Sequence, residues 1–357
     1  MNSRFAEPLV LPDPIKQPAR WLDFLEEAGR ALHCLPVVIA AGDPQLILLA
    51  ESAPRLDSRY RLAVPPVELT TTLLDKRLQY RLLMDSGAAL PATHWPSSEA
   101  EAMHAARAVG FPCIAKPAYS HLWVRSRSTK LEVVGSPEQM RTVFRKMAES
   151  NVGLIVQELI PGGDDSFFGF LSYWSSGGRL LAWCTKRKLR QYPPGFGNGS
   201  YQVSVDCPEI VETSIDLLRR LNYRGFASIE YKRDSRDGRM KLIEINPRTV
   251  SGLQMAVDAG VDLPWIAYCD LVGAELPRTA VSRAGVRFIN ESWEARRFWT
   301  SGQRSPWEWG RWLLSLAQAR SFSVLSFRDP GPALSLVARA LRRTGDVAPP
   351  ANPDTFD

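Results

Sequence analysis

The stretch GFASIEYKRDSRDGRMKLIEINPR, residues 225–248, holds two apolar runs separated by a polar turn. Asp237-Gly238 supplies the positive-φ position that a tight turn needs, so the stretch predicts a β-hairpin. The second run is unusual because polar side chains occupy alternate positions of an otherwise apolar strand: Glu244, Asn246 and Arg248. Side chains alternate between the two faces of a strand, so all of these would project from one face.

The expected pairing of this hairpin brings two carboxylates together. A turn over residues 235–239 places Glu230 directly opposite Glu244, with Asn246 on the same face. The other expected pairs are Asp234 with Met240 and Lys232 with Leu242. Directly opposed side chains have Cβ atoms about 5 Å apart, where like charges repel. Two carboxylates on an apolar hairpin therefore need a cation.

The residue types in this hairpin favour a hard metal ion. Glu230, Glu244 and Asn246 form an all-oxygen set, which suits Mg²⁺ held jointly with phosphate oxygens, with Mn²⁺ as the alternative. The competing interpretation is a solvent-facing strand side whose carboxylates are paired by Lys232 and Lys241. The hairpin alone does not choose between the two.

The composition is that of a folded protein without strong bias. The chain has 357 residues, 45% hydrophobic and 23% charged, long enough for about two or three subdomains. Its net charge of +6 suits an anionic small molecule as readily as a nucleic acid. Lys and Arg are scattered rather than clustered, which disfavours a nucleic-acid binder.

Cysteine spacing and hydropathy bear on the compartment. The five cysteines are widely spaced, and no pair has metal-ligand spacing, which predicts buried thiols in a reducing environment. Residues 1–20 lack a basic segment followed by an apolar one, and no run reaches the length of a membrane span. We therefore expect a cytoplasmic protein.

Hydrophobic periodicity predicts helices and strands in mixed order. Consecutive strands are often joined by hairpins, which favours an α+β or mixed α/β fold over a doubly wound one. The expected helices are 21–32, 67–87 with threonines capping its first turn, 99–110, one capped by Ser136, and 209–223. Besides the hairpin above, the expected strands are 35–41, 46–50, 111–118, 153–160, 167–174 and 179–194. Residues 195–202 are expected to be a flexible loop that closes over an acceptor.

Five motifs resemble the ATP-grasp superfamily of carboxylate–amine ligases. In chain order they are Asp75-Lys76 with Tyr80, FPCIAKPA (111–118), IVQELIPGGDDS (155–166), TKRKLRQYPP (185–194) and the hairpin 225–248. The basic strand 185–194 is similar to one in a branch associated with envelope polysaccharide functions, which includes D-aspartate ligase-like proteins. The resemblance spans about residues 35–330.

The resemblance implies an ATP-grasp fold, in which two α+β subdomains grip ATP. We expect a reduced α/β region over 1–70, the ATP-grasp domain over 71–280 with its nucleotide lid at 111–160, a helical extension over 281–345, and a disordered tail over 346–357. Only about seventy residues precede the ATP-grasp core, which indicates a reduced or shortened N-terminal domain. Residues 119–130 depart from the family pattern because they contain no glycine, which bears on lid closure and on activity.

The resemblance also implies roles for particular residues. Lys76 and Lys116 would contact ATP phosphates, and Glu230, Glu244 and Asn246 would hold the metal. The adenine and ribose would be held by Gln157, Glu158, Leu159, Ile160 and Asp165, or by Asp164 if the register slips by one. The alternatives are an exposed helical lysine at position 76 and an ordinary strand exit with a capping aspartate.

The basic strand and the end of the hairpin provide candidate catalytic residues. Lys186, Lys188 and Arg190 alternate on one strand face, where they would repel one another without an anion between them. We favour Lys188 and Arg190 as anion ligands over a solvated basic face. Arg248 directly follows the metal ligands, and its planar fork would hold the acyl phosphate or the tetrahedral intermediate.

The implied activity is that of an ATP-dependent ligase. ATP would activate a substrate carboxylate as an acyl phosphate, and an amine would then form the amide, releasing ADP and phosphate. The expected partners are ATP and small acid and amine substrates, and we expect a homo-oligomer. The alternative is a catalytically silent ATP-grasp module that binds nucleotide or glycan as a partner protein.

The C-terminal extension is rich in tryptophan. Helices are expected over 307–319 and 333–343, with apolar stripes and basic flanks. We favour a cap that packs on the core over a peripheral membrane anchor near glycan assembly.

Overall fold

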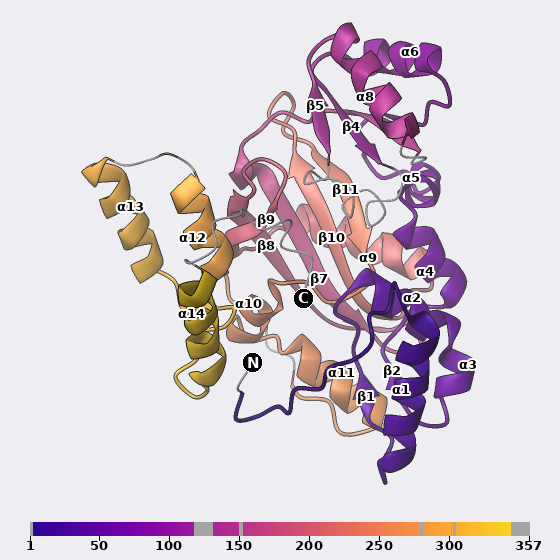
Figure 1. Ribbon diagram of the computed structural model, residues 1–357, viewed down its shortest axis with the longest axis vertical. Helices are drawn as coiled ribbons and strands as arrows, with labels where there is room; N and C mark the ends of the chain where they lie inside the picture. The colour runs from indigo at the N-terminus through magenta and orange to yellow at the C-terminus, as the bar shows by residue number, and fades with distance from the viewer. Residues whose placement is uncertain are drawn as a thin grey trace.

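The computed structural model describes residues 3–117, 131–149, 153–278, 281–300, 302 and 305–343. The described chain forms a large sheet, a smaller sheet beside one end of it, and helical regions toward both termini (Figure 1). The expected mixed α+β class is confirmed. The expectations for the glycine-free segment 119–130 and for the tail 346–357 lie outside the described residues.

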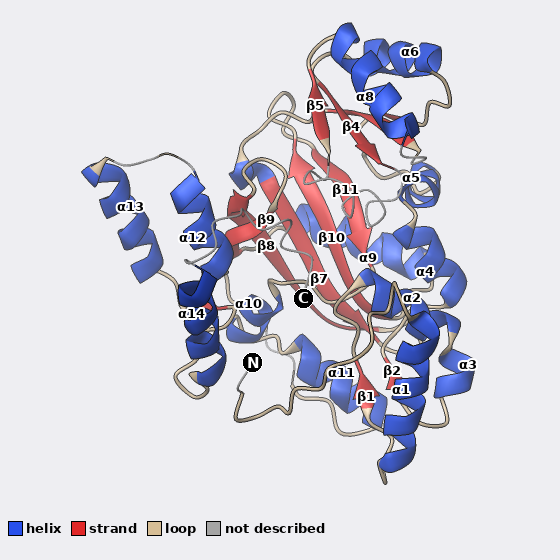
Figure 2. Ribbon diagram, viewed as in Figure 1, coloured by secondary structure: helices blue, strands red, loops and turns tan. Residues whose placement is uncertain are grey.

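The large sheet has seven strands in the order β11-β10-β7-β8-β9-β12-β13 (Figure 2). Its neighbours are antiparallel except for β12 and β13, which run parallel. The strands are β7 Phe167–Trp174, β8 Leu180–Tyr192, β9 Asn198–Ser204, β10 Gly225–Arg233, β11 Met240–Asn246, β12 Arg287–Ile289 and β13 Ser321–Phe322. Strand β9 occupies most of the segment expected to be a flexible loop, so that expectation is wrong; the strand forms because its backbone pairs with both β8 and β12.

The small sheet has the order β3-β6-β4-β5 and is antiparallel. Its strands are β3 Thr93–His94, β4 Cys113–Pro117, β5 Glu132–Val134 and β6 Leu154–Glu158. Helices α6 Glu99–Val109 and α8 Pro137–Glu149 cover one face of it (Figure 2) and build a core that includes Ala106, Met140 and Val156. Ser136 accepts a hydrogen bond from the Gln139 amide, which confirms it as the cap of α8.

The N-terminal region packs around its own small core. It comprises α1 Pro18–Ala31, β1 Val37–Val38, α2 Asp43–Glu51, α3 Ala53–Leu56 and β2 Arg61–Leu62. The strand expected over 46–50 is wrong, because these residues belong to α2. Pro44 suits the first turn of a helix, and Leu46 and Leu49 at helical spacing are both buried against Trp21.

The helix expected over 67–87 is two helices, α4 Val67–Leu74 and α5 Lys76–Met84. Asp75 breaks it, since its backbone is extended (φ −85°, ψ 111°) and its carboxylate accepts hydrogen bonds from the Arg77 and Leu78 amides. The expected threonine cap is absent, because α4 begins after Pro66 without a side-chain cap. The break places Lys76 at the first position of α5.

The two faces of the large sheet pack against different helices. Phe170 and Ile229 belong to a core with α9 Pro208–Arg220. Leu171, on the other face, belongs to a core with Met255 of α10 Leu253–Asp258 and Ile266 of α11 Leu263–Val272. Adjacent residues of one strand thus serve opposite cores, as strand alternation requires.

The register of the β10–β11 hairpin confirms one expected pair and corrects two. Glu230 lies opposite Glu244 as predicted, and the turn has Gly238 at φ +75°. A bulge after Glu230 then shifts the pairing by one residue, so Tyr231 lies opposite Leu242. Consequently Lys232 pairs with Lys241 instead of Leu242, and Arg233 replaces Asp234 opposite Met240. The sequence pattern could not predict this extra residue in one strand.

The C-terminal region has three helices, α12 Glu291–Thr300, α13 Pro306–Ala317 and α14 Gly331–Arg343. The helices expected over 307–319 and 333–343 correspond to α13 and α14. Helix α12 contacts β8 and β9, and its Phe298 stacks with Trp312 of α13 at a centroid distance of 4.3 Å. Trp307 and Leu314 of α13 are largely exposed. Within the described parts of the chain, no helix has the length and apolar character needed to cross a membrane.

Candidate nucleotide and metal site

The candidate site lies where one face of the large sheet becomes polar. The residues paired across the strands at this point are Lys186 of β8, Gly169 of β7, Glu230 of β10 and Glu244 of β11. The same face carries Leu171 and the α10–α11 core further along the strands. Lys188, two residues after Lys186, shares this face. The pairing therefore gathers both cations and carboxylates beyond the end of an apolar core.

Each of the two opposed carboxylates is paired with a lysine. The Lys188 ammonium lies 2.6 Å from Glu230 Oε2, and the Lys76 ammonium lies 3.3 Å from Glu244 Oε2. Asn246 Nδ2 donates to Glu244 Oε1 at 3.0 Å. Opposed carboxylates need cations nearby, and here lysines from β8 and α5 supply them. The structure thus brings together five of the predicted residues.

The surroundings of Glu244 strongly favour its charged form. Burial raises the pKa of a carboxyl, but the opposing effects are larger here. The charge of Lys76, the hydrogen bond from Asn246, and the charges of Lys116 and Lys188 together hold the Glu244 pKa well below its usual value. An ionised carboxylate is the form that binds a metal ion.

Lys116 enters the site from β4 of the small sheet. Its side chain is buried, donates to Gln157 Oε1 at 2.9 Å and lies 4.8 Å from the centre of the Tyr80 ring. Burial, together with the charge of Lys76, lowers the Lys116 pKa to about 7, against a smaller opposing effect of Glu244. A buried lysine whose described hydrogen-bond partner is a neutral amide is well suited to an anionic ligand.

Helix α5 is fixed to β11 by Tyr80 of the first motif and by Gln79, which the sequence interpretation did not single out. Gln79 donates to the Ile245 carbonyl at 2.8 Å and accepts from the Ile245 amide at 3.1 Å. Tyr80 donates to the Ile243 carbonyl at 2.5 Å. These bonds hold Lys76 beside Glu244. The signal for Gln79 was its position next to Tyr80, three residues after Lys76.

In the segment predicted to bind adenine, the Gln157 and Glu158 side chains contact other residues of the protein. Glu158 is ion-paired with Arg236 and with Lys241, and it accepts from the Ala92 amide at 3.1 Å. The Gln157 side chain bridges Lys116 and Thr93. Both side chains are therefore engaged. The adenine contacts expected of Gln157, Glu158, Leu159 and Ile160 all stay a prediction.

Of the two ribose candidates, Asp165 is the more accessible. Asp165, in the short 3-10 turn Asp164–Ser166, is exposed and paired with Arg187 at 2.8 Å. Asp164 accepts from the amides of Gln191 and Gly195. Asp164 therefore holds the end of β8 in place, and the role of Asp165 stays a prediction.

The structure does not bring Arg190 together with the other candidates. A bulge after Lys188 pairs Arg190 with Tyr201, whereas Lys188 pairs with Gln202, so the strict alternation expected for the basic strand is broken. Arg190 instead lies 2.6 Å from Glu294 of α12 and donates to Ser315 of α13.

Arg248 lies at the boundary with the N-terminal region. Its guanidinium is ion-paired with Asp43 at the start of α2, and the neighbouring Thr249 donates to the Ala40 carbonyl at 2.9 Å. These contacts join the end of β11 to the N-terminal helices. The predicted role of Arg248 toward an acyl phosphate is untested.

The donor set fits a metal ion that is shared with phosphate. Over the described residues, no group of three or more His, Cys, Asp and Glu side chains could hold a metal. Glu230, Glu244 and Asn246 supply two carboxylates and an amide, so a complete coordination shell needs further oxygens. Lysine ammonium groups already occupy positions beside both carboxylates, which marks the place as favourable for cations.

Lys186 is a site residue that the sequence interpretation passed over in favour of Arg190. It is 8% exposed, and no described ion pair or hydrogen bond engages its ammonium. Burial and the charge of Lys188 lower the Lys186 pKa to about 8, with Glu230 acting in the opposite sense. The alternation along β8 had placed it on the correct face.

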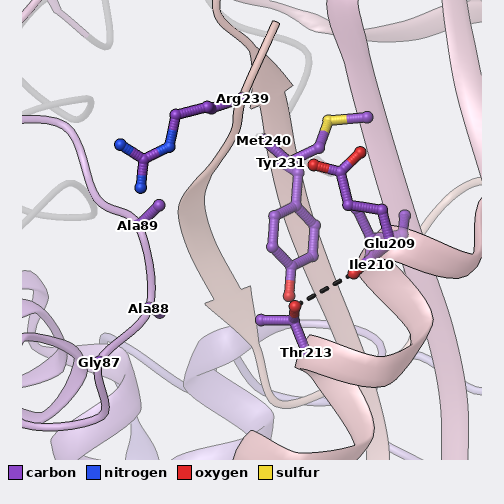
Figure 3. A pocket seen from close by; sticks show the side chains of 9 residues that line it. All are labelled: Gly87, Ala88, Ala89, Glu209, Ile210, Thr213, Tyr231, Arg239 and Met240. Carbon is purple, nitrogen blue, oxygen red and sulfur yellow. Dashed lines mark hydrogen bonds between the residues drawn. The ribbon is translucent and has the colours of Figure 1, made fainter.

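A separate pocket lies on another part of the molecule, between residues 87–89, α9 and the β10–β11 hairpin (Figure 3). Its volume is about 240 Å³, and it includes Glu209 and Arg239. Thr213 there donates to the Glu209 carbonyl at 3.1 Å. None of the predicted site residues lines this pocket, so it does not bear on the candidate site.

Comparison with known proteins finds similarity to ATP-grasp proteins over part of the chain. The family described as ATP-grasp in the biosynthetic pathway with Ter operon matches residues 174–292. A D-aspartate ligase of Enterococcus faecium (strain Aus0004) is 30% identical over 161 residues, which is 41% of this chain and 38% of the ligase. This chain therefore aligns with about two fifths of the length of that relative.

Solved structures share the fold at low sequence identity. The biotin carboxylase domain of a Hydrogenobacter thermophilus 2-oxoglutarate carboxylase, determined with MgADP and bicarbonate, has a TM-score of 0.59 at 14% identity and covers 75% of this chain and 59% of its own. An L-amino acid ligase from Bacillus licheniformis has a TM-score of 0.55 at 17% identity, covering 74% and 62%. With the partial family match and the ligase relative, these structures show that the chain has the ATP-grasp fold.

Proposed function

We propose that this chain is an ATP-dependent ligase that joins a carboxylate to an amine. The observation that carries the proposal is the opposed pair Glu230 and Glu244, facing lysines that come from different elements: Lys76 of α5, Lys116 of β4 and Lys188 of β8. Such a set neutralises a polyphosphate and holds a metal at one place. The E. faecium relative is named a D-aspartate ligase, and the B. licheniformis neighbour an L-amino acid ligase, which supports the reaction class.

In this proposal the metal ligands are Glu230, Glu244 and Asn246. Bound Mg²⁺ would neutralise the β- and γ-phosphates and polarise the group that is transferred. The neighbour determined with MgADP supports Mg²⁺ as the ion. Lys76 and Lys188 would leave the carboxylates and turn to phosphate oxygens, since the metal takes over the neutralisation of both carboxylates.

The remaining residues would position the substrates. Lys116 approaches from the small sheet and would hold the nucleotide phosphates between the two sheets. The substrate carboxylate would attack the γ-phosphorus, forming an acyl phosphate and releasing ADP. The amine would then attack the carbonyl carbon and expel phosphate. Arg248 would stabilise the negative charge on the oxygens of the acyl phosphate or of the tetrahedral intermediate that the amine forms.

The decisive experiment traces the carboxyl oxygen atoms of the acid substrate into the released phosphate. The full chain is incubated with Mg·ATP, an amine and a carboxylic acid labelled with ¹⁸O in its carboxyl group, and the products are analysed by mass spectrometry. We expect ADP, an amide and phosphate carrying one ¹⁸O, because the bridging oxygen of the acyl phosphate comes from the acid. Several acids and amines are tested in combination, so that no single substrate pair has to be assumed.

Two outcomes would overturn the proposal. Phosphate without label, together with amide formation, would exclude an acyl phosphate. Tight Mg·ATP binding with no ADP release for any pair would favour a silent module that binds nucleotide as a partner protein.

A further inference from the structure

Helix α13 is attached to the rest of the protein along one side. Its Trp309 and Trp312 pack against the ring of Phe298 of α12, at centroid distances of 4.5 and 4.3 Å. The hydroxyl of Ser315 accepts a hydrogen bond from Arg190 on β8, and the Ser315 carbonyl accepts one from Tyr201 on β9. This inner side of α13 is therefore used for packing on the core.

The opposite, outer side of α13 is apolar as well. Trp307, Leu313 and Leu314 are 74%, 54% and 62% exposed. Gly310 and Ala317, which are also exposed, lie on the same side at helical spacing. A helix that is apolar all round is normally buried, so the outer side of α13 is expected to meet a partner.

Neighbouring segments extend this exposed apolar side. Figure 1 shows α12, α13 and α14 at one edge of the molecule, away from α1 and from the small sheet. Phe327, between β13 and α14, is 98% exposed, and Leu334 and Val337 of α14 are largely exposed, three residues apart. We call the described exposed side chains of residues 299–339 the C-terminal surface. Exposed apolar groups gathered in this way mark an interaction site.

The charge at the C-terminal surface is positive. Residues 291–343 contain nine arginines, no lysine and four carboxylates, and so account for most of the net charge of +6 of the whole chain. The ion pairs described for these residues join Arg190 to Glu294 and Arg297 to Asp164. Four exposed arginines consequently have no carboxylate partner among the described residues: Arg311, Arg320, Arg328 and Arg339.

The four carboxylates of this region are engaged within the protein. They accept hydrogen bonds from described groups: Glu291 from the backbone of 323–325, Glu294 from Ser200 and Trp312, Glu308 from Ser305, and Asp329 from Ser3 and Arg4. The charge that remains available to a partner is that of the arginines, so the partner should be anionic as well as apolar.

We propose that the C-terminal surface binds the face of a membrane that contains anionic phospholipid, with the protein lying on the membrane. Tryptophan suits the boundary between head groups and acyl chains. The exposed leucines would enter the acyl region, and the arginines would pair with lipid phosphates. This inference is independent of the ligase proposal.

Two other partners fit the surface less well. A symmetric contact with a second copy of the chain would bring the same arginines face to face, where like charges repel. A nucleic acid would supply phosphates, but it would leave the leucines and valine without an apolar partner. An anionic membrane satisfies both the charge and the apolar groups.

The test is sedimentation of the full chain with large unilamellar vesicles. One set consists of phosphatidylcholine alone, and the other contains about one third phosphatidylglycerol. We expect the affinity for the anionic vesicles to be at least about tenfold higher, since each arginine near an anionic surface contributes about fivefold. This difference should shrink as salt is raised, because salt screens the charges.

Variants separate the apolar contribution from the charged one. The double variant Leu313→Gln with Leu314→Gln should weaken binding to the anionic vesicles by about tenfold or more, because burial of two leucines is lost. The double variant Arg311→Gln with Arg328→Gln should weaken it by about tenfold as well, without changing the binding to phosphatidylcholine alone.

The controls lie at other exposed positions. Met84→Gln on α5 and Arg107→Gln on α6 change the same kinds of side chain away from the C-terminal surface and should bind like the unaltered chain. Brominated phospholipid, which quenches tryptophan fluorescence at the depth of the acyl chains, reports insertion. Trp307→Phe should retain binding and lose part of this quenching. An unchanged Tm in each variant shows that the fold is kept.

Several results would overturn the proposal. Absence of sedimentation with both vesicle types would do so, as would equal affinity for the two. A dimer in analytical ultracentrifugation that dissociates in the double leucine variant, without vesicle binding, would assign the surface to a second copy of the chain. Binding of a DNA or RNA oligonucleotide that is lost in the double arginine variant, again without vesicle binding, would assign it to nucleic acid.

Discussion

At the scale of single residues, the charges of the candidate site are set by lysines and carboxylates that lie close together. Lys76 and Lys188 each pair with one carboxylate, whereas among the described residues Lys116 has Gln157 and the Tyr80 ring as close partners. A charged ammonium loses hydration when it is buried, so the neutral form gains. The charge of Lys116 therefore depends on a ligand more than the charges of Lys76 and Lys188 do.

This state of Lys116 predicts proton uptake when nucleotide binds. With a pKa of about 7, Lys116 is mostly neutral at pH 8 in the free protein. A bound triphosphate favours the charged form, so Mg·ATP binding at pH 8 should take up as much as about one proton at this residue and weaken by up to about tenfold relative to pH 6. Calorimetry in buffers of different ionisation enthalpy measures the uptake.

A variant isolates the share of Lys116 in this uptake. Lys116→Met should bind Mg·ATP more weakly and take up fewer protons at pH 8, whereas Lys16→Met, at an exposed position, should match the unaltered protein. Equal uptake in Lys116→Met and the unaltered chain would show that another group titrates.

At the scale of elements, periodicity predicted most helices and strands but not their local breaks. The hairpin turn and the opposition of Glu230 and Glu244 followed from Asp237-Gly238 and from strand alternation. The bulge after Glu230 did not, because an extra residue in one strand leaves no mark in a pattern of alternating polarity. A bulge in β8 likewise directs Arg190 away from Lys188.

The ion-pair partner of Arg190 could not be predicted from the sequence around Arg190. Glu294 lies more than a hundred residues away in the chain and meets Arg190 only because α12 packs on β8 and β9. Contacts between distant segments decide these positions, and a single sequence does not encode them as a pattern.

The contacts of Glu294 should contribute to the stability with which the C-terminal helices pack on the large sheet. Its buried carboxylate accepts from Ser200 Oγ at 2.7 Å and Trp312 Nε1 at 3.1 Å, besides its ion pair with Arg190. Glu294→Gln leaves the arginine without its counter-charge, so we expect a loss of about 3 kcal/mol in the free energy of unfolding. Urea unfolding followed by tryptophan fluorescence measures this, because Trp312 belongs to the contact.

Two further variants test whether the loss of stability comes from the unpaired buried charge or from altered packing. Glu209→Gln, at an exposed carboxylate 4.0 Å from Arg233, should change stability by less than about 0.5 kcal/mol. The double variant Glu294→Leu with Arg190→Met should recover much of the loss, since apolar pairs often replace buried ion pairs without penalty. A stable Glu294→Gln single variant would mean that α12 is held by its apolar contacts alone.

At the scale of the whole molecule, the site is assembled from segments that are far apart in the sequence. Lys76 comes from α5, Lys116 from the small sheet, and Lys188 from the large sheet. The ion pairs of Glu158 with Arg236 and Lys241 join β6 of the small sheet to the β10–β11 hairpin. A ligand that contacts all these segments must therefore oppose their separation, and global stability should report its binding.

Mg·ATP should accordingly stabilise the full chain, and the metal should be required. At a concentration one hundred times its Kd, a ligand that binds only the folded state adds about 2.7 kcal/mol, which is seen as a rise of a few degrees in Tm. Removal of Mg²⁺ with EDTA, or Glu244→Gln, should abolish most of the rise, because the metal ion that would bridge the hairpin and the triphosphate is then no longer held. Glu209→Gln should retain the full rise. Equal stabilisation by ATP with and without Mg²⁺, in the unaltered protein and in Glu244→Gln alike, would mean that the lysines alone bind the nucleotide and that the hairpin is not a metal site.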